Sequence, residues 1–286
     1  MKKIIVVNRK RLEKKIEAIK KDGLEKFFVL SDFDGTLTKV FYREKKRSSL
    51  ISILRSEKYL GENYSQKANA LYEKYHSIEI NPKVPLKNKN EKMEEWWRTH
   101  YKLLKEFGLK KSHLKRIIVS EKINLREKSN TFFNLLKEKS VPLLIFSSGG
   151  LGVNLILMFL KKEEKLFDNV FLVGTVLKWD KKGKFIGIKE PVIHSLNKKG
   201  KIIKKFPEIF EKIKKRQNVL ILGNDIEDLL MIEGLNIKNS IKIGFLNNKT
   251  KESLKNYKKY FDILILNDGT MQAVNEVLKN IVKKKI

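Results

Sequence analysis

The sequence predicts a doubly wound α/β fold with a mostly parallel sheet and an inserted helical cap domain. Three apolar runs, 27–32, 141–148 and 218–225, each end in small polar or acidic residues. Continuous apolar runs of this length are typical of strands buried on both faces of a parallel sheet. Helical patterns over 126–139 and 206–215 precede the second and third runs, and alternating strands and helices define this fold class.

Two more apolar runs, 241–246 and 262–266, extend the predicted sheet. Ligands of doubly wound folds bind beyond the carboxyl ends of the strands, so the polar ends of the first three runs should meet in one crevice. Residues 42–120 contain helical stretches and no strong strand signal. We therefore expect an α/β core of residues 1–41 and 121–286, with 42–120 as a helical cap domain that covers the crevice and excludes water.

The composition indicates a globular chain with a heavily charged surface. Of its 286 residues, 41% are apolar and 34% are charged, and the net charge is +30. Only nine of the 63 basic residues are arginine, the residue that reads bases and clamps phosphates. We interpret the charge as a lysine-rich solvated surface and do not expect nucleic acid as a partner. A positive field that steers an anionic substrate or binds a polyanion is the alternative.

Several protein classes are excluded by what the sequence lacks. It has no cysteine, which excludes disulfides, thiolate metal sites and cysteine nucleophiles. The start is too short in apolar residues for a signal peptide, and no apolar stretch approaches the roughly 18 residues of a membrane span. Neither a serine-hydrolase elbow nor a Walker loop appears. We expect a cytoplasmic monomer without a membrane partner.

Two carboxylates, Asp32 and Asp34, directly follow the first run and precede Gly35 and Thr36. Residues i and i+2 of a strand share one face, so the two side chains would repel each other unless a cation lies between them or the chain turns. This pattern predicts a metal site, with a metal-free turn as the alternative.

Residues 32–38, Asp-Phe-Asp-Gly-Thr-Leu-Thr, resemble the first motif of the haloacid dehalogenase superfamily of phosphohydrolases. The resemblance implies that Asp32 attacks phosphorus to form an aspartyl phosphate. It also implies that Asp34 protonates the leaving oxygen and later activates water. Mg²⁺ would lie against Asp32 and the backbone carbonyl of Asp34.

The ends of the other runs extend this resemblance. Ser147 matches the hydroxyl that holds a phosphate oxygen, and Ser148 with the two following glycines lets backbone amides approach the anion. Lys198, in the segment Ile-His-Ser-Leu-Asn-Lys, matches the lysine that neutralises the phosphate and the aspartyl group. The resemblance therefore implies a phosphate site of Ser147, Ser148 and Lys198.

The third run departs from the superfamily pattern, which ends in Gly-Asp-x-x-x-Asp. Here Asn224 stands at the first acidic position, Asp225 follows it, and Asp228 closes the motif in a supporting place. Asparagine offers Mg²⁺ a carbonyl oxygen but no charge. Either Asn224 ligates the metal together with Asp32 and Asp34, or the turn shifts and Asp225 does.

Five segments are similar to those of cytosolic pyrimidine 5′-nucleotidases: 75–82, 95–97, 145–149, 193–198 and 243–247. Membership of this family would imply hydrolysis of pyrimidine nucleoside 5′-monophosphates, with the cap recognising the base. Glu79 matches the family's carboxylate that hydrogen-bonds the base, and Trp97 stands where an aromatic side chain packs against it. His100 occupies a cap position where a small hydroxyl residue is usual, so we include it among the substrate-facing residues.

Plainer interpretations stay open for these residues and for the function. Glu79 could be a solvated helix-end acid, and Trp97 could simply pack between cap helices. The chain could be another phosphatase of the superfamily, acting on phosphoserine or a sugar phosphate, or a noncatalytic member that binds a polyanion. We expect a Mg²⁺-dependent phosphomonoesterase acting on nucleoside 5′-monophosphates.

Overall fold

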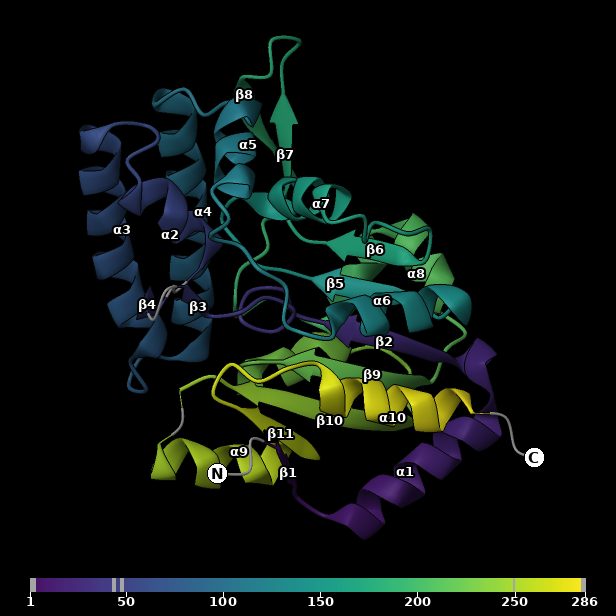
Figure 1. Cartoon of the computed structure of the whole chain (residues 1–286). Helices are drawn as coiled ribbons and strands as arrows, with labels where there is room; N and C mark the ends of the chain where they lie inside the picture. The colour runs from purple at the N-terminus through teal and green to yellow at the C-terminus, as the bar shows by residue number, and fades with distance from the viewer. Residues whose placement is uncertain (1–3, 43–44, 47–48, 249, 284–286) are drawn as a thin grey trace.

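The computed structural model describes residues 4–42, 45–46, 49–248 and 250–283 (Figure 1). Its main sheet has seven strands in the order β1-β11-β10-β9-β2-β5-β6, and every neighbouring pair is parallel except β1 with β11. The strands are β1 (Ile4–Val6), β2 (Phe27–Ser31), β5 (Leu143–Phe146), β6 (Val170–Val173), β9 (Asn218–Gly223), β10 (Asn239–Leu246) and β11 (Ile263–Leu266). The five predicted strands are confirmed, whereas β1 and β6 were not foreseen.

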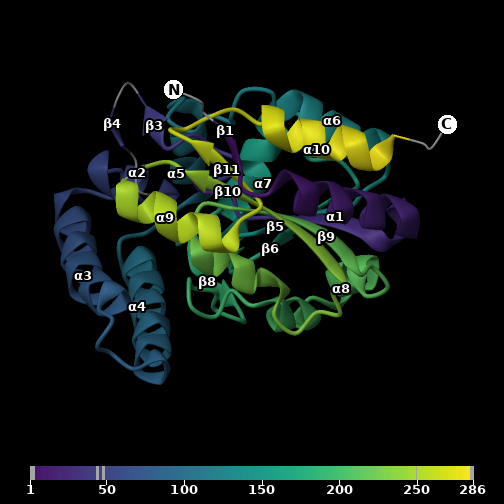
Figure 2. The ribbon, with the colours of Figure 1, turned by 90° about the horizontal axis from the view of Figure 1, so that it is seen from below.

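Helices cover both faces of the sheet (Figure 2). In β2, Phe27 and Val29 belong to one apolar cluster and Phe28 and Leu30 to another, because successive side chains of a strand point to opposite faces. The first cluster includes residues of four helices, α1 (Arg9–Asp22), α6 (Ser129–Glu138), α7 (Gly152–Lys162) and α10 (Gln272–Val282). Helix α8 (Pro207–Ile213) packs on the opposite face of the sheet. Helix α9 (Lys251–Tyr260) packs against β10 and β11. The predicted doubly wound class is therefore confirmed.

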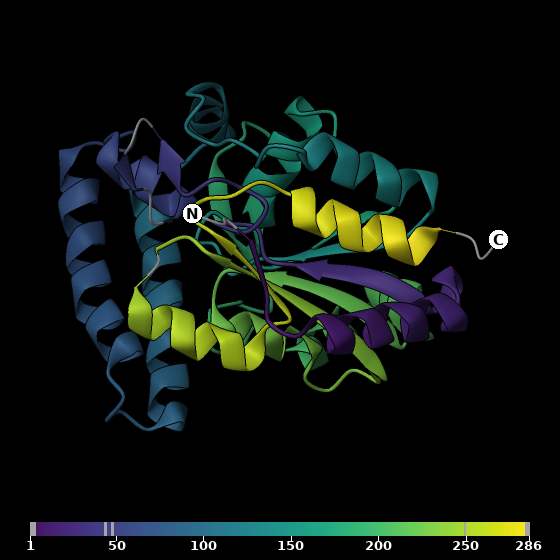
Figure 3. The same cartoon turned by 60° about the horizontal axis from the view of Figure 1, so that its bottom comes forward.

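Between β2 and β5 the chain leaves the sheet and forms mainly helices. They are α2 (Leu50–Ser56), α3 (Glu62–Ile80), α4 (Leu86–Glu106) and α5 (Lys111–Val119), which follow the short strands β3 (Phe41–Tyr42) and β4 (Lys45–Lys46), and then α6, which returns to the sheet. Helices α3 and α4 lie side by side beyond the carboxyl ends of the sheet strands (Figure 3). A separate hairpin of β7 (Val176–Trp179) and β8 (Phe185–Lys189), which the sequence did not suggest, packs against α4.

The central strand β2 pairs with β5 on one side and with β9 on the other. Leu30 lies opposite both Leu144 and Ile221, so the three strands end nearly level with one another. The backbone amide of Asp32 continues the ladder by donating to Leu222 O at 3.0 Å. The polar residues that follow these strands consequently meet at one edge of the sheet. Within the described ranges, no helix is long and apolar enough to span a bilayer.

Candidate active site

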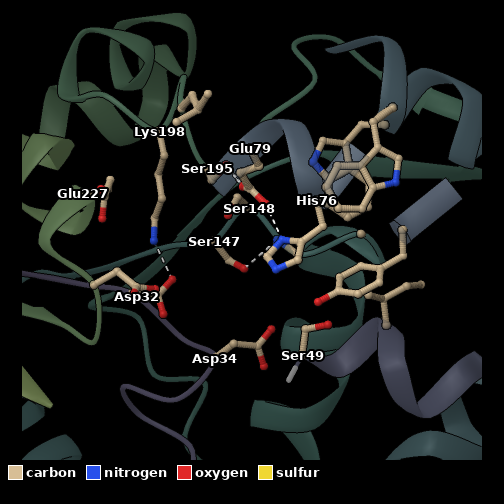
Figure 4. Close-up of a pocket in the computed structure, with 18 of the residues that line it drawn as sticks. Asp32, Asp34, Ser49, His76, Glu79, Ser147, Ser148, Ser195, Lys198 and Glu227 are labelled. Atoms are coloured by element: carbon tan, nitrogen blue, oxygen red, sulfur yellow. Dashed lines mark hydrogen bonds and ion pairs between the residues drawn. The ribbon is translucent and has the colours of Figure 1, made fainter. Parts of the chain in front are cut away.

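A pocket of about 710 Å³ opens at this edge, between the ends of β2, β5 and β9 and the helices α3 and α4 (Figure 4). All the residues that the sequence predicted for the site line it: Asp32, Asp34, Glu79, Trp97, His100, Ser147, Ser148, Lys198, Asn224, Asp225 and Asp228. The structure thus brings the predicted phosphate end and the predicted base end into one cavity.

At the bottom of the pocket, Lys198 lies between two carboxylates. Its Nζ donates to Asp32 Oδ1 at 2.5 Å and to Asp228 Oδ1 at 2.8 Å. All three residues are buried, with exposed fractions of 7% for Asp32, 4% for Lys198 and 6% for Asp228. Because uncompensated buried charges are costly, the lysine is what allows two carboxylates to lie this close together.

Burial and the neighbouring charges both shift the pKa values of Asp32 and Lys198. Burial raises the pKa of Asp32 to about 7, an effect that Lys198 opposes and the neighbouring Asp228 and Asp34 reinforce. Burial alone would lower the pKa of Lys198, but the two carboxylates outweigh it and the pKa is raised. Lys198 therefore stays protonated and supplies a fixed positive charge at the place where a phosphate would enter.

The turn after Asp32 is held by the hydroxyl of Thr38, which lies within the turn, and by the start of α2. The amide of Gly35 donates to Thr38 Oγ1 at 3.1 Å, and Thr38 Oγ1 donates to Phe33 O at 3.3 Å. Gly35 has φ of 74°, which favours glycine at this position. Asp34 Oδ2 accepts from the amide of Leu50, the first residue of α2, at 3.5 Å. The second carboxylate of the motif is therefore placed between the sheet and the inserted helices.

A buried arginine that the sequence analysis missed braces this turn. The guanidinium of Arg126 donates to four acceptors at 2.6 to 2.8 Å: the backbone oxygens of Gly35, Thr36 and Gly269 and Asn247 Oδ1. It also pairs with Asp268 at 3.1 Å, and Asp268 accepts from the amides of Val40 and Phe41. Burial lowers the pKa of Arg126 to about 10, which Asp268 opposes, so the side chain is charged at neutral pH.

The loop after β9 is organised around Asp228. Its Oδ2 accepts from the amides of Asn224 and Asp225 at 2.9 and 3.1 Å, while its other oxygen meets Lys198. A Cβ on Gly223 would lie 2.5 Å from the Asp228 Cβ, so glycine is required for this close approach. The supporting place predicted for Asp228 corresponds to these contacts.

The residues predicted to hold a metal offer only oxygen atoms. Asn224 Oδ1 accepts from Thr36 Oγ1 at 3.1 Å, and burial raises the pKa of Asp225 to about 7. Among the described residues, no three His, Cys, Asp or Glu side chains are grouped as a metal site on their own. A set of one or two carboxylates, an amide oxygen and a backbone carbonyl nevertheless suits Mg²⁺, which keeps several waters and takes few protein ligands. The donor chemistry therefore fits the predicted ion.

At the other end of the pocket, Glu79 of α3 reaches the core. Its Oε1 accepts from Ser195 Oγ at 2.5 Å, and its Oε2 lies 3.1 Å from His76 Nδ1. No role in the site was predicted for Ser195 or His76, although both lie in segments that carried the family resemblance. The carboxylate of Glu79 is thus fixed in orientation at the pocket wall and is not a freely solvated helix-end acid.

His100 lines the pocket but is only 3% exposed. Its ring packs edge-on against Trp97, with centroids 5.6 Å apart, and its Nε2 has no hydrogen-bond partner among the described residues. Burial, with a smaller contribution from Arg55, lowers the pKa of His100 to about 3. The imidazole is therefore neutral at physiological pH and supports the indole of Trp97.

This burial predicts a pH-dependent contribution to stability. Between about pH 6.5 and pH 3 the unfolded chain binds a proton at His100 that the folded protein excludes, so stability is lost as the pH falls. From pH 6.5 to 5 the loss is about 2 kcal/mol. We expect the difference in unfolding free energy, wild type minus His100→Gln, to fall by about this amount in urea titrations at the two pH values. A difference independent of pH would contradict a neutral, buried His100.

The mostly parallel sheet, with Asp32, Lys198 and Asp228 buried together beyond its strands, is that of the haloacid dehalogenase fold, a fold of phosphohydrolases. The solved phosphoserine phosphatase complex shares this fold, with a TM-score of 0.51, 18% identity, and coverage of 88% of this chain and 97% of that one. A much stronger match is cytosolic 5′-nucleotidase IIIB bound to cytidine, with a TM-score of 0.87, 28% identity, and coverage of 98% and 94%.

The family model of pyrimidine 5′-nucleotidase (UMPH-1) matches residues 35–282, and the chain belongs to this family. The 7-methylguanosine phosphate-specific 5′-nucleotidase of Homo sapiens is 33% identical over 95% of this chain and 90% of that protein. Its Xenopus laevis relative, form A, is 31% identical over 96% and 93%. The chain is thus an enzyme of the 5′-nucleotidase class, a phosphoric monoester hydrolase.

Proposed function

We propose that this enzyme hydrolyses nucleoside 5′-monophosphates with Mg²⁺ through an aspartyl phosphate on Asp32. One observation carries the proposal: a single pocket joins the buried centre of Asp32 and Lys198 to a wall that presents Glu79 and Trp97. A phosphate at one end and a base at the other match these two chemistries. We further propose that residues 42–120 act as the cap, and that the enzyme works in the cytoplasm as a monomer on a small molecule.

The residues can divide the reaction as follows. A carboxylate oxygen of Asp32 attacks phosphorus, the bond to the 5′ oxygen breaks, and Asp34 gives that oxygen a proton. Asp34 then takes a proton from a water molecule, which attacks the aspartyl phosphate and releases phosphate, so that Asp32 is restored. Lys198 and the backbone amides after Ser147 hold the phosphate oxygens throughout.

Mg²⁺ would be held by Asp32, by the backbone carbonyl of Asp34, and by Asn224 or Asp225. When bound, it supplies positive charge that favours a phosphate next to these carboxylates.

The proposal covers more than one base of the nucleotide. The family is named for pyrimidines, cytidine occupies the cytosolic 5′-nucleotidase IIIB structure, and the curated relatives are named for 7-methylguanosine phosphate. Cytosine and 7-methylguanine each carry an exocyclic amine that Glu79 could accept from, and every one of these bases has a face that Trp97 could stack on. The positive charge of 7-methylguanine would add a cation–π attraction to the indole.

A substrate panel tests the proposal. We expect CMP, UMP or 7-methylguanosine 5′-monophosphate to be hydrolysed with a higher kcat/KM than phosphoserine or ribose 5-phosphate, and EDTA to abolish the reaction. Glu79→Gln should raise KM for the preferred nucleotide by about tenfold, because the remaining amide oxygen accepts from the base without the charge of the carboxylate, and should leave ribose 5-phosphate hydrolysis unchanged. A preference for phosphoserine or a sugar phosphate would assign another phosphatase activity. No turnover, together with salt-sensitive binding of nucleic acid, would favour the noncatalytic alternative.

A further inference from the structure

A column of aromatic rings runs through α3 and α4 and ends at the loop of residues 147–150 after β5. This loop is called the phosphate loop below. The rings of Tyr75 and Trp96 are parallel within 9° at 5.9 Å, and those of Trp96 and Trp97 within 4° at 5.2 Å. Trp96 and Trp97 both line the pocket, but Tyr75 and Trp96 are buried whereas Trp97 is half-buried. Trp97 is therefore the ring of the column with the most surface available to a ligand.

Trp97 reaches the core at Gly150. A Cβ on Gly150 would lie 2.3 Å from Trp97 Cζ3 and 2.8 Å from Cη2, far inside van der Waals contact. The indole thus fills the space that any other residue at this position would need. Because an indole held between Trp96, His100 and the phosphate loop has little room to withdraw, a side chain at residue 150 would have to displace it.

The backbone itself does not demand glycine here. Gly150 is not among the glycines with positive φ, in contrast to Gly152 with φ of 62°. An alanine at residue 150 would be compatible with the local chain conformation, and only the contact with Trp97 opposes it.

We propose that Gly150 is a specificity-determining residue. The missing side chain lets Trp97 rest on the phosphate loop, so that the base platform and the phosphate site share one wall and their separation is fixed. This inference rests on the proposed nucleotidase function and adds to it a residue of the core that sets the position of the base platform.

The test compares Gly150→Ala with the wild type on two substrates. One is the preferred nucleoside 5′-monophosphate, and the other is p-nitrophenyl phosphate, which has no base. We expect Gly150→Ala to lower kcat/KM for the nucleotide about tenfold more than kcat/KM for p-nitrophenyl phosphate, because the backbone amide of residue 150 serves both substrates whereas stacking on Trp97 serves only the nucleotide. Thermal melting establishes that the variant is folded.

A double-mutant cycle with Trp97→Ala separates the proposed contact from a defect in the phosphate loop. With the indole removed, Gly150→Ala should change kcat/KM for the two substrates equally. Tryptophan fluorescence reports the contact independently of activity: Gly150→Ala should shift the emission in the presence of Trp97 but not in the Trp97→Ala background. Gly149→Ala is the contrasting variant, since a Cβ at residue 149 would lie next to Ser147 and Asp34. Any loss of kcat/KM in this variant should be equal for the two substrates.

The outcomes are distinct. If Gly150→Ala lowers kcat/KM for both substrates equally in the presence of Trp97, or still acts more strongly on the nucleotide when Trp97 is absent, the inference is overturned and the nucleotidase function stands. If the wild-type enzyme shows no preference for nucleotides over p-nitrophenyl phosphate, the proposed function fails and the inference fails with it.

Discussion

Asp32→Asn is expected to lower kcat for every phosphate monoester by about four orders of magnitude. The amide has nearly the shape of the carboxylate, so it can remain next to Lys198, but its oxygen lacks the charge needed to attack phosphorus. Phosphate release at saturating nucleotide measures the effect, and urea unfolding checks that the fold persists.

Asp168→Asn is the matched control, because it removes the same charge from an exposed residue before β6 and should retain wild-type activity. Residual activity of Asp32→Asn within tenfold of the wild type would mean that another group attacks the phosphate.

Arg126→Met is expected to lower the free energy of unfolding by about 3 to 5 kcal/mol. The substitution removes the ion pair with Asp268 and the hydrogen bonds that the guanidinium donates to three buried carbonyl oxygens. Arg126→Met should also lower kcat, since the turn that carries Asp34 loses the contacts of the guanidinium. Arg126→Lys should restore only part of the free energy of unfolding and only part of kcat. Urea titration and initial rates give the two quantities.

Arg98→Met is the control for loss of an arginine. Arg98 also pairs with carboxylates, Glu94 and Glu190, but its side chain is 44% exposed, and exposed pairs contribute at most about 1 kcal/mol. Equal destabilisation by the two substitutions would contradict a special structural role for Arg126.

The sequence predicted the sheet where burial on both faces leaves a continuous apolar run, as in β2, β5 and β9. It missed β1, which has three residues at the sheet edge, and the hairpin of β7 and β8, where Lys178 and Gly187 interrupt the apolar pattern. Short or irregular strands are stabilised by their tertiary neighbours, which periodicity along the chain does not reveal.

The residues of the site were predictable for a different reason. Strands of a parallel sheet deliver their following residues to one edge, so the motifs of three strands had to converge. Arg126 could not be found in this way, because its acceptors are backbone oxygens of Gly35, Thr36 and Gly269, which have no signature in the sequence. The contact of Gly150 with Trp97 was hidden likewise, since it depends on how α4 meets the core.

The position of β2 has a consequence for the order in which the protein can fold during synthesis. This strand leaves the ribosome before either of its hydrogen-bonding partners, β5 (Leu143–Phe146) and β9 (Asn218–Gly223). Until β5 has been made, the nascent chain carries a largely apolar strand with two unpaired edges, and one edge stays unpaired until β9 follows, so the strand is a template for pairing with other chains. The helices encoded between β2 and β5 form from local contacts, so they can fold early and shorten the time during which that strand is exposed.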